Sequence, residues 1–122
     1  MIVKELIVDA YGCRAELSDI KAMEKAGRKA LGKVGAQIVR KSSYRFQPHG
    51  QTLVFILKES HFVVSTWPEF GFATVNIFLC NDAMDAKIVW GEMKKFLRPA
   101  NAVLKTVSHR IGKARPGLKR VA

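Results

Sequence analysis

The chain has 122 residues, of which 48% are hydrophobic and 25% are charged, and its formal net charge is +11. This length and composition fit one globular domain, and they exclude a wholly disordered chain and a pair of ordinary domains. Two cysteines are too few for a disulfide scaffold or a four-cysteine zinc site, and no metal site is expected.

Several short segments are rich in β-branched and aromatic residues and are bounded by turn residues, as strands are. Two longer segments carry apolar residues at helical spacing. Several strands are expected to be antiparallel neighbours, and the sequence predicts an α+β fold: a two-layer α/β sandwich with a mainly antiparallel sheet and two helices on one face. In chain order, the expected elements are a strand at 2–8, a helix at 20–34, strands at 36–44, 52–57, 62–66 and 72–80, a second helix after residue 82, and a strand at 102–107.

Capping residues and glycines mark the two expected helices. Ser18-Asp19 offers an N-cap for the first helix, and Asn81-Asp82 is expected to cap the second, which ends before Pro99. Gly27 and Gly32 each weaken the first helix by about 1 kcal/mol relative to alanine. We therefore expect close packing of this helix against the sheet at both glycines.

The residues that could carry chemistry gather between residues 44 and 80. In chain order they are Phe46-Gln47-Pro48-His49-Gly50, Glu59-Ser60-His61, Thr66-Trp67-Pro68-Glu69, Phe70-Gly71-Phe72 and Cys80. This ordered set resembles that of the prokaryotic S-adenosylmethionine decarboxylase proenzymes, which use a pyruvoyl group. That family has a Phe-x-Pro-x-Gly turn, an apolar strand, Glu-Ser-His, Thr-Trp-Pro-Glu, an aromatic-Gly-aromatic step and a cysteine at this spacing. Any one of these motifs alone is weak evidence, whereas the whole set in order is specific.

The resemblance implies that the chain cuts itself between Glu59 and Ser60, into residues 1–59 and 60–122. The Ser60 hydroxyl would attack the preceding carbonyl, and elimination and hydrolysis would leave a pyruvoyl group at the new N-terminus. In the family this group forms a Schiff base with the substrate amine and is the electron sink for decarboxylation. From the residues alone, Ser60 also fits an ordinary turn serine.

The resemblance also implies roles for five other residues. Cys80 matches the cysteine that returns a proton to the α-carbon, Phe46 and Trp67 match aromatics that hold adenine, and Glu69 matches the carboxylate that holds the ribose. Thr52 stands where the family has a processing serine. From the residues alone, the cysteine also fits a small buried hydrophobe, the aromatics fit core packing, and the glutamate fits a solvated turn.

Two positions depart from the family pattern. Ser65 stands where the family has a histidine that is assigned proton transfer during self-cleavage, and a serine hydroxyl has no accessible base at neutral pH. We expect strand alternation to place His61 on a different face from residue 65, so His61 would not replace the missing imidazole. Glu5 stands where many relatives carry a histidine.

Basic residues are concentrated near the C-terminus. Residues 93–122 contain no acidic side chain, and six basic residues follow from Lys105 onward. We divide the chain into one S-adenosylmethionine decarboxylase-like domain, residues 1–108, and a basic tail, residues 109–122. A basic tail can bind polyanions, but it is also typical of a solvated terminus.

Four functions remain open. The first is a pyruvoyl-dependent S-adenosylmethionine decarboxylase that serves spermidine synthesis, expected to form a homodimer with active sites near the subunit interface. The second is a related pyruvoyl-dependent decarboxylase of ornithine or arginine, and the third is an unprocessed regulatory homologue. The fourth, a nucleic-acid-binding module, is disfavoured because the chain has no recognised binding motif. With neither a signal-peptide pattern nor a membrane-length apolar run, the expected location is the cytoplasm.

Overall fold

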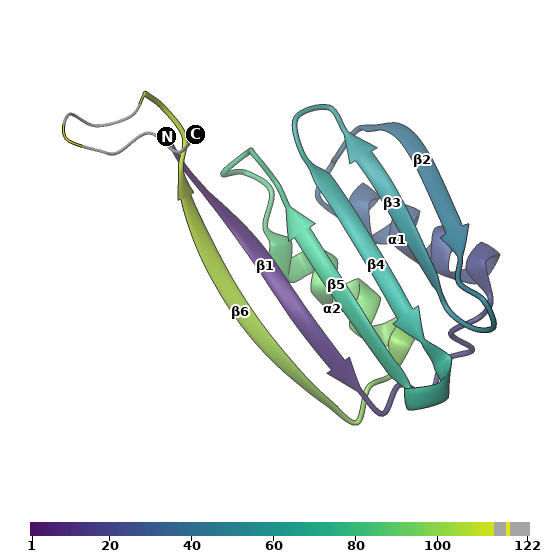
Figure 1. The fold of residues 1–122 in the computed structure, drawn as a ribbon. Coiled ribbons are helices and arrows are strands. Elements are labelled where there is room, and N and C mark those ends of the chain that lie inside the picture. Colours follow the sequence, from purple (N-terminus) through teal and green to yellow (C-terminus); the bar gives the residue numbers. More distant parts are fainter. Residues whose placement is uncertain (114–116, 118–122) are drawn as a thin grey trace.

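The computed structural model describes residues 1–113 and Gly117. All six strands form one antiparallel sheet, in the order β2-β3-β4-β5-β1-β6. Both helices cover the same face of this sheet (Figure 1), which confirms the predicted two-layer α+β architecture. The elements are β1 (Ile2–Tyr11), α1 (Ile20–Lys33), β2 (Ile38–Arg45), β3 (Gln51–Leu57), β4 (His61–Trp67), the 3-10 helix η1 (Pro68–Phe70), β5 (Phe72–Phe78), α2 (Ala86–Leu97) and β6 (Asn101–Arg110).

The hydrophobic core lies between the sheet and the helices. Along β3, β4 and β5, fully buried residues alternate with less buried ones, because successive side chains point to opposite faces of a sheet. Among the described residues, no helix lies on the opposite face of the sheet (Figure 1), and we call it the open face. The core contains Leu53, Phe55, Phe62, Val64, Val75 and Ile77 from the sheet and Met23, Leu31, Met93 and Leu97 from the helices.

The helix caps confirm one expectation and correct another. The Asp19 carboxylate accepts a hydrogen bond from the backbone N–H three residues on, at 3.0 Å, and caps α1 as predicted. The prediction that Asn81-Asp82 caps α2 is wrong. Asp85 is the cap, and its carboxylate accepts from the Lys87 N–H at 2.9 Å. Asn81 instead accepts from the Ala83 N–H and closes a turn before the helix, so the last capping residue of the segment starts α2.

The two glycines of α1 have different environments. A Cβ atom on Gly27 would lie 2.6 Å from the ring of Phe55, so the helix can approach the sheet here only because this residue has no side chain. Nothing lies within 4 Å of a Cβ atom on Gly32. The prediction of close packing against the sheet is therefore confirmed at Gly27, but it is wrong at Gly32.

The last strand is longer than predicted. β6 continues through Arg110, which pairs with Ile2, because β1 supplies a partner along its whole length. The Ile111 N–H then donates to the Met1 carbonyl at 2.8 Å. Of the predicted basic tail, residues 114–116 and 118–122 lie outside the described residues. Within the described residues, no helix is long and apolar enough to cross a membrane.

Candidate functional site

The bond at which the sequence predicts cleavage, Glu59-Ser60, lies in the tight turn between β3 and β4, residues 58–60. We call this segment the cleavage turn after that prediction. The Leu57 N–H donates to the Ser60 carbonyl at 2.9 Å, and the Lys58 N–H donates to the Gln37 carbonyl at 3.1 Å. Ser60 is half-buried, whereas the two residues before it are exposed. The sequence forms this turn because the apolar alternation of β3 stops at Leu57 and that of β4 resumes at Phe62.

Cys80 lies beside this turn. β5 pairs with β4 so that Phe78 faces His61, and the chain then carries Cys80 past the end of the sheet toward the turn. Glu59, Ser60 and Cys80 line one cavity of about 260 Å³. Burial raises the pKa of the Cys80 thiol, and the charge of Glu59 raises it further. The thiol is therefore protonated at neutral pH and can act as a proton donor.

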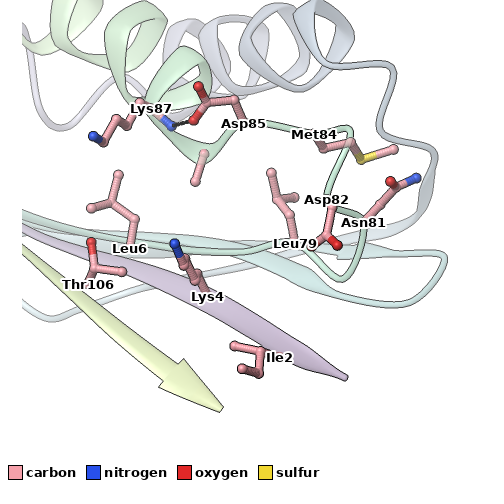
Figure 2. Close-up of a pocket in the computed structure, with 11 residues that line it drawn as sticks. Ile2, Lys4, Leu6, Leu79, Asn81, Asp82, Met84, Asp85, Lys87 and Thr106 are labelled. Atoms are coloured by element: carbon pink, nitrogen blue, oxygen red, sulfur yellow. Dashed lines mark hydrogen bonds between the residues drawn. The ribbon is translucent and has the colours of Figure 1, made fainter. Parts of the chain in front are cut away.

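A larger cavity, of about 330 Å³, lies between β1 and the start of α2. Figure 2 shows Lys4, Leu6 and Lys87 lining it, and the carboxylate of Asp85 is occupied with capping the helix. Its lining includes none of the catalytic or substrate-binding residues that the sequence predicts. We therefore place the candidate site at the smaller cavity.

Thr52 and Ser65 form a hydroxyl pair on the open face. They are opposite each other on β3 and β4, and their Oγ1 and Oγ atoms are 2.7 Å apart. Ser65 is five residues from Ser60 along an extended strand, a distance of about 16 Å at about 3.3 Å per residue. The structure thus brings Thr52 and Ser65 together, but it places them away from the cleavage turn of the same chain.

An aromatic cluster lies at the other end of β4. The ring centroids of Phe46 and Trp67 are 6.0 Å apart, and those of Trp67 and Phe72 are 5.6 Å apart. Glu69 follows on η1 and is exposed. In Figure 1 this end of β4 is at the bottom of the sheet, whereas the Ser60 turn is at the top. Trp67 is seven positions from Ser60, which corresponds to about 23 Å of extended strand.

Two aromatic residues of this cluster are not among those that the sequence singled out for binding. Tyr44 lies 6.4 Å from Phe46 between ring centroids and is 70% exposed, and Phe72 packs against both Trp67 and Tyr11. The sequence could have indicated Phe72, because it starts the strand after the Trp-Pro-Glu segment and strand alternation places it on one face with the next alternate residues. The exposure of Tyr44 depends on β2 being an edge strand, which the sequence does not reveal.

A second polar cluster lies on the open face near the cleavage turn. The Glu5 carboxylate meets His109 Nε2 at 2.7 Å and accepts a hydrogen bond from the Asn76 amide. Burial by itself would raise the pKa of Glu5, but these hydrogen bonds and the nearby His109 and His61 outweigh it and hold the pKa below its usual value. His61 stacks on Phe78 with ring centroids 5.1 Å apart.

The expectation that His61 and Ser65 occupy different faces of their strand is wrong. The two residues are four positions apart, and side chains at even separations share a face. His61, Ser65 and Trp67 all lie on the half-exposed side of β4. His61 is nevertheless about 13 Å from Ser65 along the strand, because four residues separate them.

The chain resembles known proteins over nearly all of its length. A family model described as S-adenosylmethionine decarboxylase matches residues 4–110. Among curated proteins named S-adenosylmethionine decarboxylase proenzyme, that of Thermosipho melanesiensis is 36% identical over 78% of this chain and 74% of its own. That of Fervidobacterium nodosum is 36% identical over 90% of this chain and 80% of its own.

A solved structure agrees with these sequence matches. The crystal structure of the adenosylmethionine decarboxylase from Aquifex aeolicus VF5 superimposes with a TM-score of 0.77 at 25% identity, and 98% of each chain is covered. The matched residues include the cleavage turn, the hydroxyl pair, the aromatic cluster and Cys80. The chain therefore belongs to the S-adenosylmethionine decarboxylase family.

Proposed function

We propose that this protein is a pyruvoyl-dependent S-adenosylmethionine decarboxylase proenzyme that cleaves itself between Glu59 and Ser60. Its product would supply the aminopropyl donor for spermidine synthesis. The observation that carries this proposal is the shared cavity of Ser60 and Cys80 at a tight turn. The cavity joins the bond to be cut, the residue that would become the pyruvoyl group and a protonated thiol.

The first reaction is the conversion of the Glu59-Ser60 amide into an ester. Ser60 Oγ attacks the Glu59 carbonyl carbon, the C–N bond breaks, and the nitrogen leaves as the amine of Ser60. Removal of the Ser60 α-proton then expels the Glu59 carboxylate, and hydrolysis of the resulting enamine releases ammonia. The turn favours this attack because backbone hydrogen bonds of Leu57, Lys58 and Ser60 fix the segment that contains both reacting groups.

The cavity suits the decarboxylation that follows. A pyruvoyl group at residue 60 would be half-buried and would supply an electron sink for the loss of carbon dioxide. Cys80 lines the same cavity, and its raised pKa keeps a proton on Sγ at neutral pH. The thiol can then deliver that proton to the α-carbon of the substrate.

We propose that the complete active site forms between two copies of the chain. In one copy, the aromatic cluster and Glu69 lie about 23 Å from Ser60 along the strand. A nucleoside joined to one amino acid does not span that distance, so a single copy cannot hold both the adenine and the reacting carbon. A second copy related by a twofold axis would place its aromatic cluster and its Thr52–Ser65 pair over the Ser60 turn of the first.

The open face is the surface that we propose for this homodimer. Val54, Val63 and Ile7 are half-exposed on it, and Ile56 and Val103 are 44% and 55% exposed. No helix covers these apolar side chains in one copy. Packing two open faces together would bury them, and their burial would stabilise the dimer.

A carbon dioxide release assay on the incubated protein tests this function. We expect carbon dioxide to be released from S-adenosylmethionine. We also expect Trp67→Ala to weaken the binding of S-adenosylmethionine, measured as a rise in KM, more than Glu69→Gln does, because the ring supplies contact area as well as orientation. Phe70→Ala is the matched control, since Phe70 is 76% exposed next to the cluster. Faster release of carbon dioxide from ornithine or arginine than from S-adenosylmethionine would show that the proposed substrate is wrong.

The unprocessed regulatory homologue is the second candidate, and one observation favours it. The Thr52–Ser65 pair contains two hydroxyls and no imidazole, so the residue that the family uses for proton transfer has no replacement within hydrogen-bond distance of Thr52. This candidate predicts an intact chain that binds S-adenosylmethionine without releasing carbon dioxide.

A further inference from the structure

Four lysines follow one another along α1 at intervals of four residues. Lys21, Lys25, Lys29 and Lys33 are all exposed. Residues four apart are neighbours on a helix, so these lysines form a ladder about 18 Å long at about 1.5 Å per residue. Like charges at this spacing destabilise a helix. The ladder therefore opposes the folding of α1, which points to a role other than fold stability.

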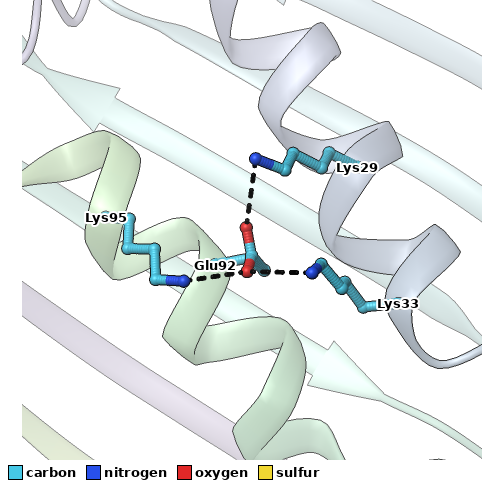
Figure 3. A network of polar contacts seen from close by, with 4 residues as sticks. All are labelled: Lys29, Lys33, Glu92 and Lys95. Atoms are coloured by element: carbon cyan, nitrogen blue, oxygen red, sulfur yellow. Dashed lines mark hydrogen bonds and ion pairs between the residues drawn. The ribbon is translucent and has the colours of Figure 1, made fainter.

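One carboxylate from α2 contacts two lysines of this ladder. Figure 3 shows Glu92 between the helices, with its oxygens 3.8 Å from Lys29, 3.9 Å from Lys33 and 3.2 Å from Lys95. The hydrogen bond from Lys95 and the nearby lysines hold the pKa of Glu92 below its usual value, so it is ionised at neutral pH. A single negative charge still leaves two of these three cations without compensation.

The second acidic residue of this surface is also shared. Glu24 pairs with Arg28 at 3.1 Å and with Lys41 of β2 at 3.0 Å. Within the described residues, neither Lys21 nor Lys25 has an ion pair. Seven cations therefore face two carboxylates, a net charge of +5. We call this surface the basic helical face; it consists of Lys21, Glu24, Lys25, Arg28, Lys29, Lys33, Lys41, Glu92 and Lys95.

A shallow groove runs through the basic helical face between α1 and α2. It has a volume of about 390 Å³, and its lining combines apolar residues with charged ones: Ala22, Ala26, Phe96, Lys25, Lys29, Lys95 and Glu92. Lys25 and Lys29 come from α1 and Lys95 comes from α2, so cations from both helices can approach an extended chain of anions.

We propose that the basic helical face binds the phosphate backbone of a nucleic acid. The cations of the ladder recur about every 6 Å, at four residues of about 1.5 Å each, and this regular spacing suits a regular polyanion. An anionic membrane suits the surface less well, because the large apolar residues of α1 face the core and are buried. The basic helical face lies on the helix-covered side of the sheet, opposite the open face. Only its Lys33 end approaches the Ser60 cavity, which Gly35 and Ala36 help to line, whereas Lys21 and Lys25 lie two or more helical turns away along α1.

The basic helical face differs from the C-terminal tail, which is the only basic segment that the distribution of charge along the sequence indicates. The lysine spacing is visible in the sequence. The convergence of α1, α2 and β2 on two carboxylates requires the folded chain.

Fluorescence anisotropy with labelled 20-nucleotide RNA and DNA of mixed sequence tests the proposal. We expect both to bind the full chain, with similar affinity because the contacts are to phosphates. The variant with Lys21, Lys25, Lys29 and Lys33 all changed to Gln should bind at least about tenfold more weakly at low salt. It should also lose about 3 units of the slope of log K against log[salt], at about 0.7 per phosphate contact on a single strand.

The matched control removes the same number of charges from the C-terminal tail, by changing Lys113, Arg115, Lys119 and Arg120 to Gln. It should retain more affinity than the ladder variant. If the ladder variant does not fold, the double variant Lys21→Gln/Lys25→Gln serves instead, because neither residue has an ion pair among the described residues. It should lose about 1.4 units of slope.

Three results would overturn the proposal. The first is an equal loss of affinity in the tail control, which would assign binding to net charge. The second is tighter binding of polyglutamate or of phosphatidylglycerol vesicles than of nucleic acid at the same concentration of negative charge. The third is an absence of any salt-dependent binding by the wild type. Carbon dioxide release by the Lys21→Gln/Lys25→Gln variant should equal that of the wild type, because neither residue lines the Ser60 cavity, so this test is separate from that of the decarboxylase.

Discussion

Replacing Ser65 by His should accelerate self-cleavage by at least about tenfold. General-base catalysis contributes a factor of about 10² to 10⁴, and a new imidazole that is imperfectly placed would recover part of it. The change breaks the 2.7 Å hydroxyl pair with Thr52, which costs about 1 kcal/mol of stability. It adds no volume to the core, because residue 65 faces the open side of the sheet.

The distance within one chain decides where the new imidazole acts. Ser65 lies about 16 Å from Ser60 in its own chain, which is too far for proton transfer. The acceleration should therefore occur across the dimer. A chain that carries both Ser60→Ala and Ser65→His cannot be cleaved, but it should speed the cleavage of a wild-type chain with which it is paired.

A gel time course of co-expressed, differently tagged chains measures this effect. The matched control pairs the wild-type chain with Ser60→Ala alone, which keeps Ser65. The acceleration should disappear as the pH falls below the pKa of the imidazole, about 6.5 before any shift by the site. Equal cleavage in both pairings, together with fast cleavage of Ser65→His as a monomer, would refute the composite site.

Three further predictions concern packing, charge and the thiol. Gly27→Ala should lower the free energy of unfolding by about 1 to 2 kcal/mol, because its Cβ would lie 2.6 Å from a buried ring. Gly32→Ala should raise the free energy of unfolding by about 0.5 kcal/mol. Urea titrations of both variants measure these changes, and two shifts of the same sign would contradict the prediction. Glu5→Gln should cost about 1 kcal/mol at pH 7. The pKa of Glu5 is lower in the folded chain than its ordinary value of 4.5. The stability difference between wild type and variant should therefore persist above about pH 4.5 and disappear as the pH falls through the folded pKa, which thermal melts at several pH values would show. Glu59→Gln should lower the pKa of Cys80 and speed its alkylation at pH 8, and an unchanged rate would show that the carboxylate does not act on the thiol.

The alternation of apolar residues was sufficient to predict the two layers, because burial on one face of each strand is local information. The strand order was not, since β1 pairs with β5 and β6, which lie far along the chain. The same limit applies to the site. Motif spacing indicated which residues matter, but only the folded register shows that Ser60 and Trp67 lie at opposite ends of one strand.

The polar cluster at Glu5 shows a second limit. Its members come from β1, β5 and β6, and no spacing in the sequence connects them. The sequence marks Glu5 only as a departure from the family pattern, and it gives no sign that Asn76 and His109 are its partners. The position of His61 does not depend on the folded chain, because counting along the strand places His61 on the face of Ser65.

The central claim is that Ser60 cuts the chain that contains it, and the intact mass of the purified protein tests it most directly. After prolonged incubation at neutral pH, we expect two fragments, residues 1–59 and residues 60–122. The second should be lighter than its encoded mass by one ammonia, which is the net change when an N-terminal serine becomes a pyruvoyl group. The Ser60→Ala variant should remain whole under the same conditions. A wild-type chain that keeps its full-length mass, while still binding S-adenosylmethionine, would contradict the claim and assign the protein to the unprocessed regulatory class.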